Sequence, residues 1–372
     1  MKIELQHLTK KFPAQGRKNR KEVIAVNDFS FEIPDGKLIG LLGPSGCGKS
    51  TTLNLICGLE KPTSGKLYFG DKDVTALAPE FRGVGMVFQN YALYPHLTVE
   101  QNIRFPLENL KGSEKLSKEQ MQARVAEAAR LVQIEELMDR KPKELSGGQQ
   151  QRVAIARALV KMPDVLLLDE PLSNLDARLR LQTREEIRKI QKKTGITTVF
   201  VTHDQEEAMS ISDMIVVMKQ GVLQQIGEPQ EVYDNPVNLF VAKFLGTPPI
   251  NVFEGYIRQG NLYIGEEAVL SCNELLRESS AAAIEGKKVF VGIRPEGFVL
   301  KEDGAFSCQL SGIEVMGRDI SVVSTHPSAL VVTIRSIINA ENYVNPSATQ
   351  VRFDIKPNKV FLFDKETEER LR

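Results

Sequence analysis

A glycine-rich run follows a short apolar segment near the start of the chain, where Leu38–Leu42 leads into Gly43-Pro44-Ser45-Gly46-Cys47-Gly48-Lys49-Ser50-Thr51. This run fits the pattern G-x-x-x-x-G-K-[ST], whose backbone N–H groups surround phosphate oxygens. A match by chance is expected in about 1 in 100 chains of this length, from average residue usage. The flanking residues predict a strand before the loop and a helix from Ser50 to Leu59 after it. The sequence therefore predicts an α/β domain that binds a nucleotide. Lys49 should reach the β- and γ-phosphates, and Ser50 should bind Mg²⁺.

Two carboxylates follow the apolar run Val165–Leu168, which we interpret as a buried parallel strand. Side chains at the carboxyl ends of such strands project into the ligand crevice. Asp169 fits a place near Mg²⁺, outside its directly bound ligands, and Glu170 fits the base that polarises an attacking water. The alternative is a strand that simply ends in surface acids. Because a phosphate loop precedes these residues, the catalytic interpretation is favoured.

Two further polar residues stand at expected strand ends. His203 follows Thr197–Thr202, and a neutral imidazole there can hold the γ-phosphate or order the water. Gln89 follows an apolar segment and can sense Mg²⁺ and water through its amide. A lone histidine is more often structural or exposed, and a loop glutamine is usually only solvated. The position beside the expected crevice favours a functional role for His203.

Composition excludes several classes of protein. At 372 residues the chain predicts two or three domains, and equal counts of 48 basic and 48 acidic residues give no field that favours nucleic acid or an anionic membrane. The four cysteines, at positions 47, 57, 272 and 308, lack paired or metal-ligand spacing, which suits a reducing cytosol. The first eight residues alternate like a strand and predict no leader. No apolar run approaches the roughly 18 residues of a membrane span. Any membrane role should therefore depend on a partner.

The order of elements predicts two domains. Strands and helices alternate over residues 1–245, with a helical subdomain at about 90–162. The next four residues, Gly246-Thr247-Pro248-Pro249, are interpreted as a linker. The expected helices span residues 118–140, 149–162 and 176–194. Short β-like runs then dominate residues 246–372 and predict a small barrel or sandwich. They are residues 287–293, 320–324, 330–334, 351–355 and 360–363. Val289–Leu300 and Val351–Asp364 are similar to each other, so this domain is interpreted as a doubled unit.

A second glycine turn, Leu145-Ser146-Gly147-Gly148-Gln149, precedes another expected helix. Ser146 can donate its hydroxyl to a phosphate, Gly147 and Gly148 permit close backbone approach, and the helix start offers free N–H groups. A helix cap with a glycine turn is the plainer interpretation and is compatible with the first.

Together these segments make the chain resemble the ATPase subunit of ABC importers along its whole length. The motifs that carry the resemblance, in the family's order and spacing, are the phosphate loop at Gly43, Leu145–Gln149, Leu168-Asp169-Glu170-Pro171, Ser173-Asn174-Leu175-Asp176 and His203. The resemblance implies a P-loop ABC ATPase domain with a helical subdomain and a small all-β, OB-like (TOBE-type) C-terminal domain. It also implies ATP and Mg²⁺ as ligands.

The resemblance assigns further roles. Gln89 belongs to the loop that relays the nucleotide state to membrane subunits and touches Mg²⁺, and Asp176 belongs to a loop that crosses the dimer. The Ser146 turn contacts ATP held by the opposite subunit, so that ATP joins two subunits and hydrolysis releases them. Phe12 is the candidate that stacks on adenine, with the basic segment Pro13–Glu22 after it as a solvated turn. Tyr91–His96 is expected to dock on a membrane subunit, although core packing is the alternative.

The C-terminal domain favours the sugar-importer branch, through residues 245–253 and Gly292-Ile293-Arg294-Pro295-Glu296. Val252 and Phe253 depart from the usual pattern, and importers of polyamines, ferric iron or sulfate carry a similar domain, so these cargoes stay open. The expected partners are a second copy, transmembrane permease subunits and, through the complex, an extracytoplasmic solute-binding protein. The expected location is peripheral, on the cytoplasmic face of the membrane.

Two other classes of ATP-binding protein fit the sequence less well. A soluble ABC ATPase acting on DNA or ribosomes should carry a long coiled coil, two cassettes or a basic surface, whereas this chain has one cassette and no net charge. A catalytically silent regulator should lack Glu170, His203 or the Ser146 turn, and all three are present. An importer ATPase without nucleic-acid partners is therefore the favoured function.

Overall fold

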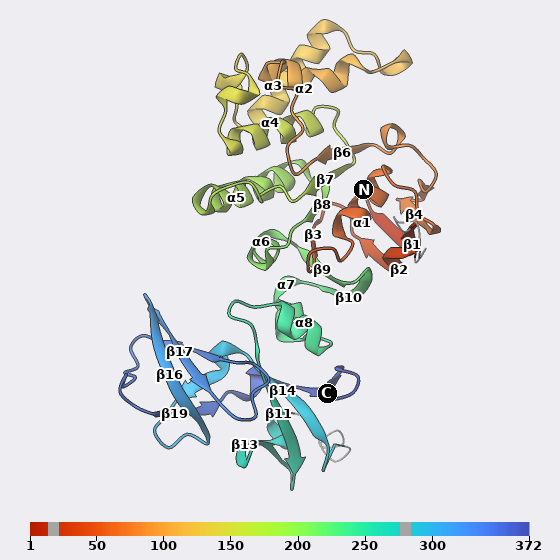
Figure 1. Cartoon of the computed structure of the whole chain (residues 1–372). Helices are drawn as coiled ribbons and strands as arrows, with labels where there is room; N and C mark the ends of the chain where they lie inside the picture. The colour runs from red at the N-terminus through yellow and green to blue at the C-terminus, as the bar shows by residue number, and fades with distance from the viewer. Residues whose placement is uncertain (14–21, 276–283, 372) are drawn as a thin grey trace. The chain divides into compact units, whose positions relative to one another are not determined.

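The computed structural model describes residues 1–13, 22–275 and 284–371. The chain forms two compact units, Met1–Pro229 and Gln230–Arg372 (Figure 1). In the described residues, no helix is both long enough and apolar enough to cross a membrane. The cysteines at positions 47, 57, 272 and 308 are all free and buried.

A six-stranded sheet forms the centre of the first unit, in the order β10-β9-β3-β8-β7-β6. Its five strands from β9 to β6 are parallel, and β10 pairs antiparallel with β9. The sequences of the parallel strands are continuously apolar because helices and a second sheet bury both faces of this sheet. The strands are β3 (Leu38–Leu42), β6 (Val84–Val87), β7 (Val165–Asp169), β8 (Thr197–Val201), β9 (Met214–Lys219) and β10 (Val222–Gly227).

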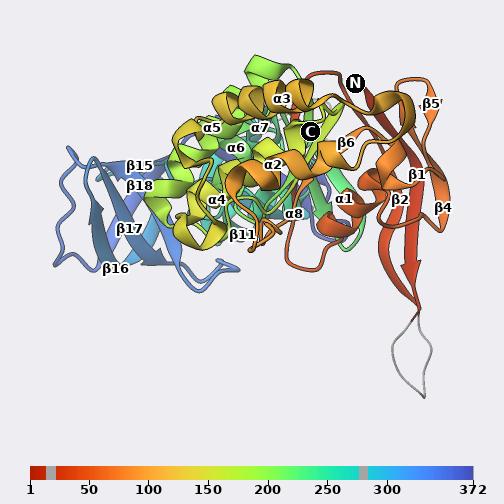
Figure 2. The ribbon, with the colours of Figure 1, turned by 90° about the horizontal axis from the view of Figure 1, so that it is seen from above.

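A smaller antiparallel sheet, in the order β2-β1-β4-β5, lies at the right of both views of the ribbon (Figures 1 and 2). Its strands are β1 (Ile3–Phe12), β2 (Val23–Ile33), β4 (Ser64–Phe69) and β5 (Lys72–Asp73). One apolar cluster joins the two sheets to the buried face of helix α1 (Lys49–Cys57), with Leu53 and Ile56 fully buried. The phosphate loop and its helix are thus built into the core of this unit.

Three helices form the expected helical subdomain: α2 (Val99–Glu108), α3 (Lys118–Leu131) and α4 (Gly147–Leu159). They group together in both views (Figures 1 and 2). Short 3-10 turns at Pro79–Phe81, Gly112–Glu114, Glu135–Leu137 and Pro142–Glu144 lie in the connections. The helices differ from the sequence-based spans. The first expected helix ends at Leu131 rather than residue 140 because Gln133 takes a left-handed backbone. The second spans 147–159 rather than 149–162 because Ser146 caps it and Met162 turns left-handed before Pro163.

Two more helices of this unit begin near the carboxyl ends of the strands: α5 (Ala177–Thr194) and α6 (Gln205–Ile211). Asp176 caps the start of α5, and Gly195, with φ of 66°, ends it. This span agrees with the sequence-based prediction. A glycine is favoured at this stop because residues with a Cβ resist the left-handed conformation.

The second unit begins with α7 (Pro229–Asp234) and α8 (Leu239–Phe244) and continues as strands. One sheet has the order β13-β12-β11-β14-β20-β21, and the other β15-β19-β16-β17-β18. The first contains β11 (Asn251–Arg258), β12 (Asn261–Ile264), β13 (Glu267–Ser271), β14 (Lys288–Ile293), β20 (Val360–Asp364) and β21 (Arg370–Leu371). The second contains β15 (Phe298–Leu300), β16 (Phe306–Met316), β17 (Asp319–Thr325), β18 (Ile334–Asn339) and β19 (Gln350–Ile355). A 3-10 turn, Cys272–Glu274, follows β13.

The predicted repeat is visible in how the two sheets are joined. Each copy is a strand, a 3-10 turn and a strand, with turns at Pro295–Gly297 and Pro357–Lys359. The copies cross between the sheets, so that β14 pairs with β20 and β15 pairs with β19. Equivalent positions exchange backbone hydrogen bonds: the Arg294 N–H donates to the Lys359 carbonyl at 3.0 Å, and the Lys356 N–H donates to the Gly297 carbonyl at 2.9 Å. The similarity of the two segments therefore reflects a two-fold arrangement in this unit.

One expected strand of this unit is wrong. Residues 330–333 of this run form a bend, and the strand β18 begins only at Ile334. Val332 is 93% exposed, so its apolar neighbours do not form the buried face that the pattern suggested. The true strand alternates buried and half-exposed residues and pairs with β17 from Ile334 to Asn339.

The compact units divide after Pro229, whereas the sequence-based boundary stood after residue 245. The helix α8 packs its Leu239 and Ala242 into an apolar cluster with strand residues of the β unit. Arg294, fully buried, donates to the carbonyls of Tyr233, Ala242 and Leu245 and stacks on the Tyr233 ring at 3.8 Å. These contacts tie α7 and α8 to the strands. The linker Gly246–Pro249 is therefore a connection within this compact unit.

Replacing Arg294 by methionine is expected to lower the free energy of unfolding by about 3 kcal/mol, because three carbonyls, two of them in buried hydrogen bonds, lose their donor. Urea unfolding followed by circular dichroism measures this. Arg335→Met is the matched control, since Arg335 pairs with Glu314 at the surface and should cost about 1 kcal/mol or less. Equal losses in the two variants would show that Arg294 does not clamp the helices.

Candidate nucleotide and catalytic site

The phosphate loop connects β3 to α1 with Pro44, Ser45 and Gly46 exposed, and with Cys47 and Lys49 buried. Gly48 is the N-cap of α1 with φ of 104°, and a Cβ there would lie 2.2 Å from the Ala25 carbonyl oxygen. Both the backbone conformation and the crowding therefore require glycine at this position. Gly43 lies at the strand end, and Thr51 is half-buried in the first turn of the helix.

The start of α1 is suited to an anion. No side chain caps it, and its first turn carries no acidic residue. The free N–H groups and the positive end of the helix dipole then favour a phosphate. Lys49 donates to the Gly43 carbonyl at 2.7 Å and the Pro44 carbonyl at 3.1 Å, so its ammonium lies within the loop. Burial raises the pKa of the Cys47 thiol, which keeps this loop residue neutral.

Two of the three residues predicted around Mg²⁺, Ser50 and Asp169, are in contact. The Ser50 hydroxyl donates to an Asp169 carboxylate oxygen at 3.0 Å. Burial is the main reason that the pKa of Asp169 is raised, and the Ser50 hydrogen bond and the Lys49 charge oppose that shift. Hydroxyl and carboxylate oxygens are the ligand types that Mg²⁺ prefers, so this pair fits that ion.

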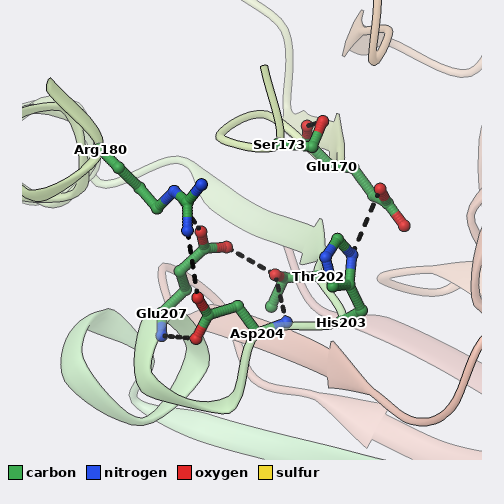
Figure 3. A pocket seen from close by; sticks show the side chains of 7 residues that line it. All are labelled: Glu170, Ser173, Arg180, Thr202, His203, Asp204 and Glu207. Atoms are coloured by element: carbon green, nitrogen blue, oxygen red, sulfur yellow. Dashed lines mark hydrogen bonds and ion pairs between the residues drawn. The ribbon is translucent and has the colours of Figure 1, made fainter. Parts of the chain in front are cut away.

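Glu170, Gln89 and His203 meet at one carboxylate oxygen, Oε2 of Glu170. The Gln89 amide donates to it at 3.1 Å, and Nδ1 of His203 lies 3.4 Å away (Figure 3). Glu170 has φ of 44°, which is uncommon for a residue other than glycine, and its N–H donates to the Val201 carbonyl of β8 at 3.1 Å. The three residues come from the ends of β6, β7 and β8. The expectation that these strand ends share one edge is met.

The loop after Glu170 joins the same group. The Asn174 amide donates to the Gln89 carbonyl at 2.8 Å, and the Ser173 hydroxyl donates to the Glu170 carbonyl at 3.0 Å. Asp176 is exposed and accepts from the Leu179 N–H at 2.9 Å as the cap of α5. Asp176 therefore caps α5, and its place in a dimer stays a prediction.

The Ser146 turn is a helix cap, as the plainer interpretation expected. The Ser146 hydroxyl oxygen accepts from the Gln149 N–H at 3.3 Å, and the Gln149 side chain accepts from the Ser146 N–H at 2.9 Å. The hydroxyl proton is not used by this cap. Gly148 is buried against α5, where a Cβ would lie 2.9 Å from the Leu179 side chain, so this glycine serves packing. Ser146 itself is exposed, and α4 lies apart from α1 in both views (Figures 1 and 2).

Phe12 is the last residue of β1 and pairs with Val23 of β2. Its ring is half-buried, and the Lys10 ammonium lies 4.8 Å from the ring centroid. Two residues beyond Val23, the Ala25 carbonyl lies against Gly48 of the phosphate loop. This strand pair therefore passes close to the phosphate loop, although stacking on adenine stays a prediction. Most of the segment Pro13–Glu22 lies outside the described residues.

The segment Tyr91–His96 has both buried and exposed parts. Tyr91 is buried, and Arg157 donates to the carbonyls of Tyr91 and Ala92 at 2.8 and 2.7 Å. Tyr94 packs on Phe105 with ring centroids 4.6 Å apart. Pro95 and His96 are exposed. Core packing thus accounts for the two tyrosines, and docking remains a prediction for the exposed residues.

A small pocket beside Glu170 contains residues to which the sequence analysis assigned no role. Its lining residues are Glu170, Ser173, Arg180, Thr202, His203, Asp204 and Glu207 (Figure 3). Glu207 lies in the acidic stretch Asp204-Gln205-Glu206-Glu207, which resembles an exposed helix start. Its burial arises from the packing of α6 against β3, which the pattern of acids at residues 204–207 does not reveal.

A strand, a phosphate loop and a helix, with a hydroxyl–carboxylate pair and a glutamate at the same sheet edge, define a P-loop ATPase cassette. Residues 26–173 match the ABC transporter family model, and residues 246–298 match the MalK OB fold domain. The trehalose/maltose import ATP-binding protein MalK of Thermococcus litoralis is 43% identical, over 93% of this chain and 95% of its own length. The Fe(3+) ions import ATP-binding protein FbpC of Fusobacterium nucleatum is 50% identical, over 75% of this chain and 72% of its own length.

The chain therefore belongs to the ABC transporter family, and it is an ATP-binding ATPase of that family. A solved dimeric ATP-binding cassette in a post-hydrolysis state, bound to ADP and Pi, is 33% identical with a TM-score of 0.53. The matched region covers 61% of this chain and 98% of the chain in the solved structure. The predicted fold, a P-loop ABC ATPase domain with an all-β C-terminal domain, is confirmed.

Proposed function

We propose that this chain is the ATP-hydrolysing subunit of an ABC importer for carbohydrates, with ATP bound between the phosphate loop of one copy and the Ser146 turn of a second. The observation that carries the catalytic part is the meeting of Gln89, Glu170 and His203 beside the Ser50–Asp169 pair. These groups lie at one edge of the sheet, where they can act together on a terminal phosphate and an attacking water.

Each residue of this edge has a definable task. Lys49 and the N–H groups of residues 43–51 bind the phosphates. Ser50 and Gln89 would hold Mg²⁺, with Asp169 placed near the ion through its contact with Ser50, and Mg²⁺ when bound neutralises phosphate charge. Glu170 orients the attacking water and accepts its proton. His203 contacts Glu170 and lies where it can hold the γ-phosphate, and Gln89 keeps the carboxylate in place through its amide.

The ATP site shared by two copies is called the composite site. It is supported by the exposed Ser146 hydroxyl, whose proton remains available, and by the exposed Asp176. The similar solved cassette is dimeric, which supports a pair of copies. In this proposal ATP binding closes the pair and hydrolysis opens it. Phe12 is proposed to stack on adenine.

The choice of carbohydrate depends on the C-terminal unit. The trehalose/maltose relative aligns over nearly the whole of both chains, and residues 246–298 match an OB fold named for MalK. The ferric-iron relative aligns over only three quarters of each chain. Ferric iron is the second candidate because that relative has the higher identity.

The same proposal includes the assembly. Two copies of the chain energise transmembrane permease subunits, which receive cargo from an extracytoplasmic solute-binding protein. The chain would then lie on the cytoplasmic face of the membrane as a peripheral subunit. The exposed residues Pro95 and His96 belong to the segment proposed to dock on the permease.

Uptake measurements in the cells that make the protein test this function. Deletion should abolish uptake of at least one labelled oligosaccharide while leaving ferric-iron uptake unchanged. The intact gene should restore uptake, and a Lys49→Ala gene should not. Mild-detergent purification of the tagged chain should recover permease subunits and a solute-binding protein. Loss of iron uptake alone would favour the second candidate, and recovery without any membrane protein would overturn an importer role.

A further inference from the structure

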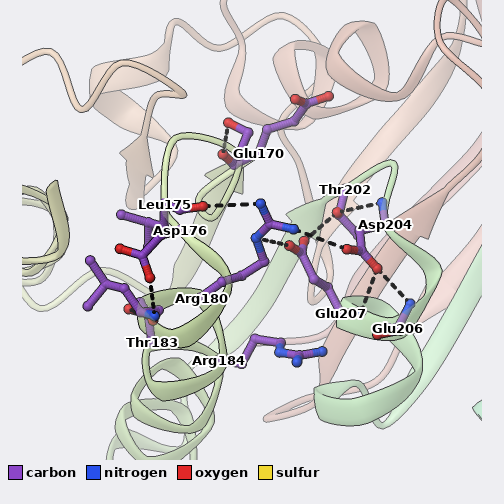
Figure 4. A network of polar contacts seen from close by, with 12 residues as sticks. Glu170, Leu175, Asp176, Arg180, Thr183, Arg184, Thr202, Asp204, Glu206 and Glu207 are labelled. Carbon is purple, nitrogen blue, oxygen red and sulfur yellow. Dashed lines mark hydrogen bonds and ion pairs between the residues drawn. The ribbon is translucent and has the colours of Figure 1, made fainter. Parts of the chain in front are cut away.

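Arg180 connects two loops of the catalytic edge. It lies in the first turn of α5, and its guanidinium donates to the Leu175 carbonyl at 3.1 Å (Figure 4). The same guanidinium lies 3.5 Å from the Asp204 carboxylate and 3.6 Å from the Glu207 carboxylate. Leu175 directly precedes Asp176, and Asp204 directly follows His203. One side chain therefore contacts both the Asp176 loop and the His203 loop.

Glu207 makes this connection more than a surface ion pair. Its side chain is only 5% exposed, and it accepts from the Thr202 hydroxyl at 2.5 Å. A buried carboxylate needs positive charge nearby, and loss of the cation that contacts it weakens that compensation. Arg180 is in direct contact with Glu207, whereas Arg184, one turn further along α5, donates to Ser210 and acts on Glu207 only through its charge.

The same contacts fix both neighbours of His203. The Thr202 hydroxyl oxygen accepts from the Asp204 N–H at 3.0 Å while its proton goes to Glu207. The Asp204 carboxylate caps α6, accepting from the Glu206 and Glu207 N–H groups at 2.8 and 3.2 Å. His203 stands between these two anchored residues and faces Glu170 (Figure 3). The residues on both sides of His203 are thus held by contacts that include Glu207, the ion-pair partner of Arg180.

The other end of the connection reaches the Ser146 turn. Leu175 is buried, and a Cβ added to Gly147 would lie 3.2 Å from its side chain. The Arg180 bond to the Leu175 carbonyl therefore places the residue that packs under the Ser146 turn. Asp176, next in sequence, is exposed where the proposed second copy would lie.

We propose that Arg180 is a positioning residue that couples the Asp176 loop to His203, so that closure of the two copies and correct placement of His203 occur together. Its role in closure rests on the composite site proposed above. Arg180 touches neither ATP nor water in this account and acts through Leu175, Asp204 and Glu207.

Full-length Arg180→Met, Arg180→Lys and Arg184→Met proteins test the coupling. Arg180→Met should lower kcat about 10- to 100-fold, since small misplacement of a catalytic group costs that much. KM for ATP and binding of a fluorescent ATP analogue should change less than about two-fold, because the phosphate loop is untouched. Arg180→Lys should recover part of kcat by keeping the charge. Arg184→Met, the matched control, should retain wild-type kcat.

A double-variant cycle separates positioning from a merely structural role. If Arg180 acts through His203, Arg180→Met should have little further effect on kcat in a His203→Ala background. Additive losses would overturn the coupling. Loss of analogue binding together with kcat in Arg180→Met, without recovery in Arg180→Lys, would also overturn it and indicate a general loss of folding.

The dimer measurement distinguishes this inference from the proposed function. Glu170→Gln protein should dimerise with ATP, and Glu170→Gln with Arg180→Met should need a higher protein concentration. If Glu170→Gln alone does not dimerise, even with its membrane partners, the composite site is wrong, and the closure half of the inference is overturned with it. If both proteins dimerise equally and Arg180→Met keeps wild-type kcat, the composite site stands and the coupling is overturned.

Discussion

A Glu170→Gln protein is expected to bind ATP normally and to turn it over about 10²–10⁴-fold more slowly, the usual contribution of a general base. Glutamine keeps the size of the side chain but cannot accept a proton from water. The phosphate loop and the Ser50–Asp169 pair are unchanged, so ATP affinity should stay within about two-fold of wild type. Steady-state phosphate release and binding of a fluorescent ATP analogue measure the two quantities.

The control for this prediction is Glu206→Gln, which removes an exposed carboxylate three residues after His203. Its turnover should match wild type. A Glu170→Gln protein that hydrolyses ATP at the wild-type rate would remove Glu170 from the catalytic role, and the base would then have to be sought elsewhere.

A Ser146→Arg protein is expected to bind ATP as one copy while failing to form the ATP-dependent dimer. The exposed hydroxyl is proposed to reach the triphosphate of the second copy, and a bulky cation would fill that position. In the Glu170→Gln background, size-exclusion chromatography with ATP should show only monomer. Analogue binding by the isolated chain should change little.

Loss of the helix cap must be separated from this effect, because removing a serine cap costs about 1 kcal/mol. Ser117 provides the control, since it caps α3 through the same arrangement with Gln120 as Ser146 forms with Gln149. Ser117→Arg should lose similar stability and still dimerise. If both arginine variants dimerise, the turn does not contact a neighbouring nucleotide.

The positions of the catalytic residues could be predicted because these residues follow directly after strands. Val165–Leu168 and Thr197–Thr202 are apolar runs followed by polar residues, and parallel strands place their carboxyl ends together. The sequence therefore predicts Asp169, Glu170 and His203 at one edge of the sheet. Ser50 contacts Asp169 for the same reason, since the phosphate loop leaves β3 at that edge.

The pocket around Arg180 was not predictable in the same way. An arginine in a charged helix and a glutamate in an acidic helix start both resemble solvated surface residues. Only the packing of α5 and α6 buries Glu207 and brings Arg180 against it. The prediction of a strand at residues 330–334 was wrong for a related reason. Apolar composition does not reveal which residues will pair with a neighbouring strand.

Local sequence alone determined the phosphate loop, the strand ends and the caps, since tight turns and helix starts depend on a few adjacent residues. It also determined the chain's family, through motifs whose order and spacing are specific. Tertiary structure alone decided that α7 and α8 pack with the β unit through Arg294, and that Arg180 lies between the Asp176 and His203 loops. Those contacts join residues far apart in the chain, and burial, which makes them strong, is a property of packing and not of the sequence nearby.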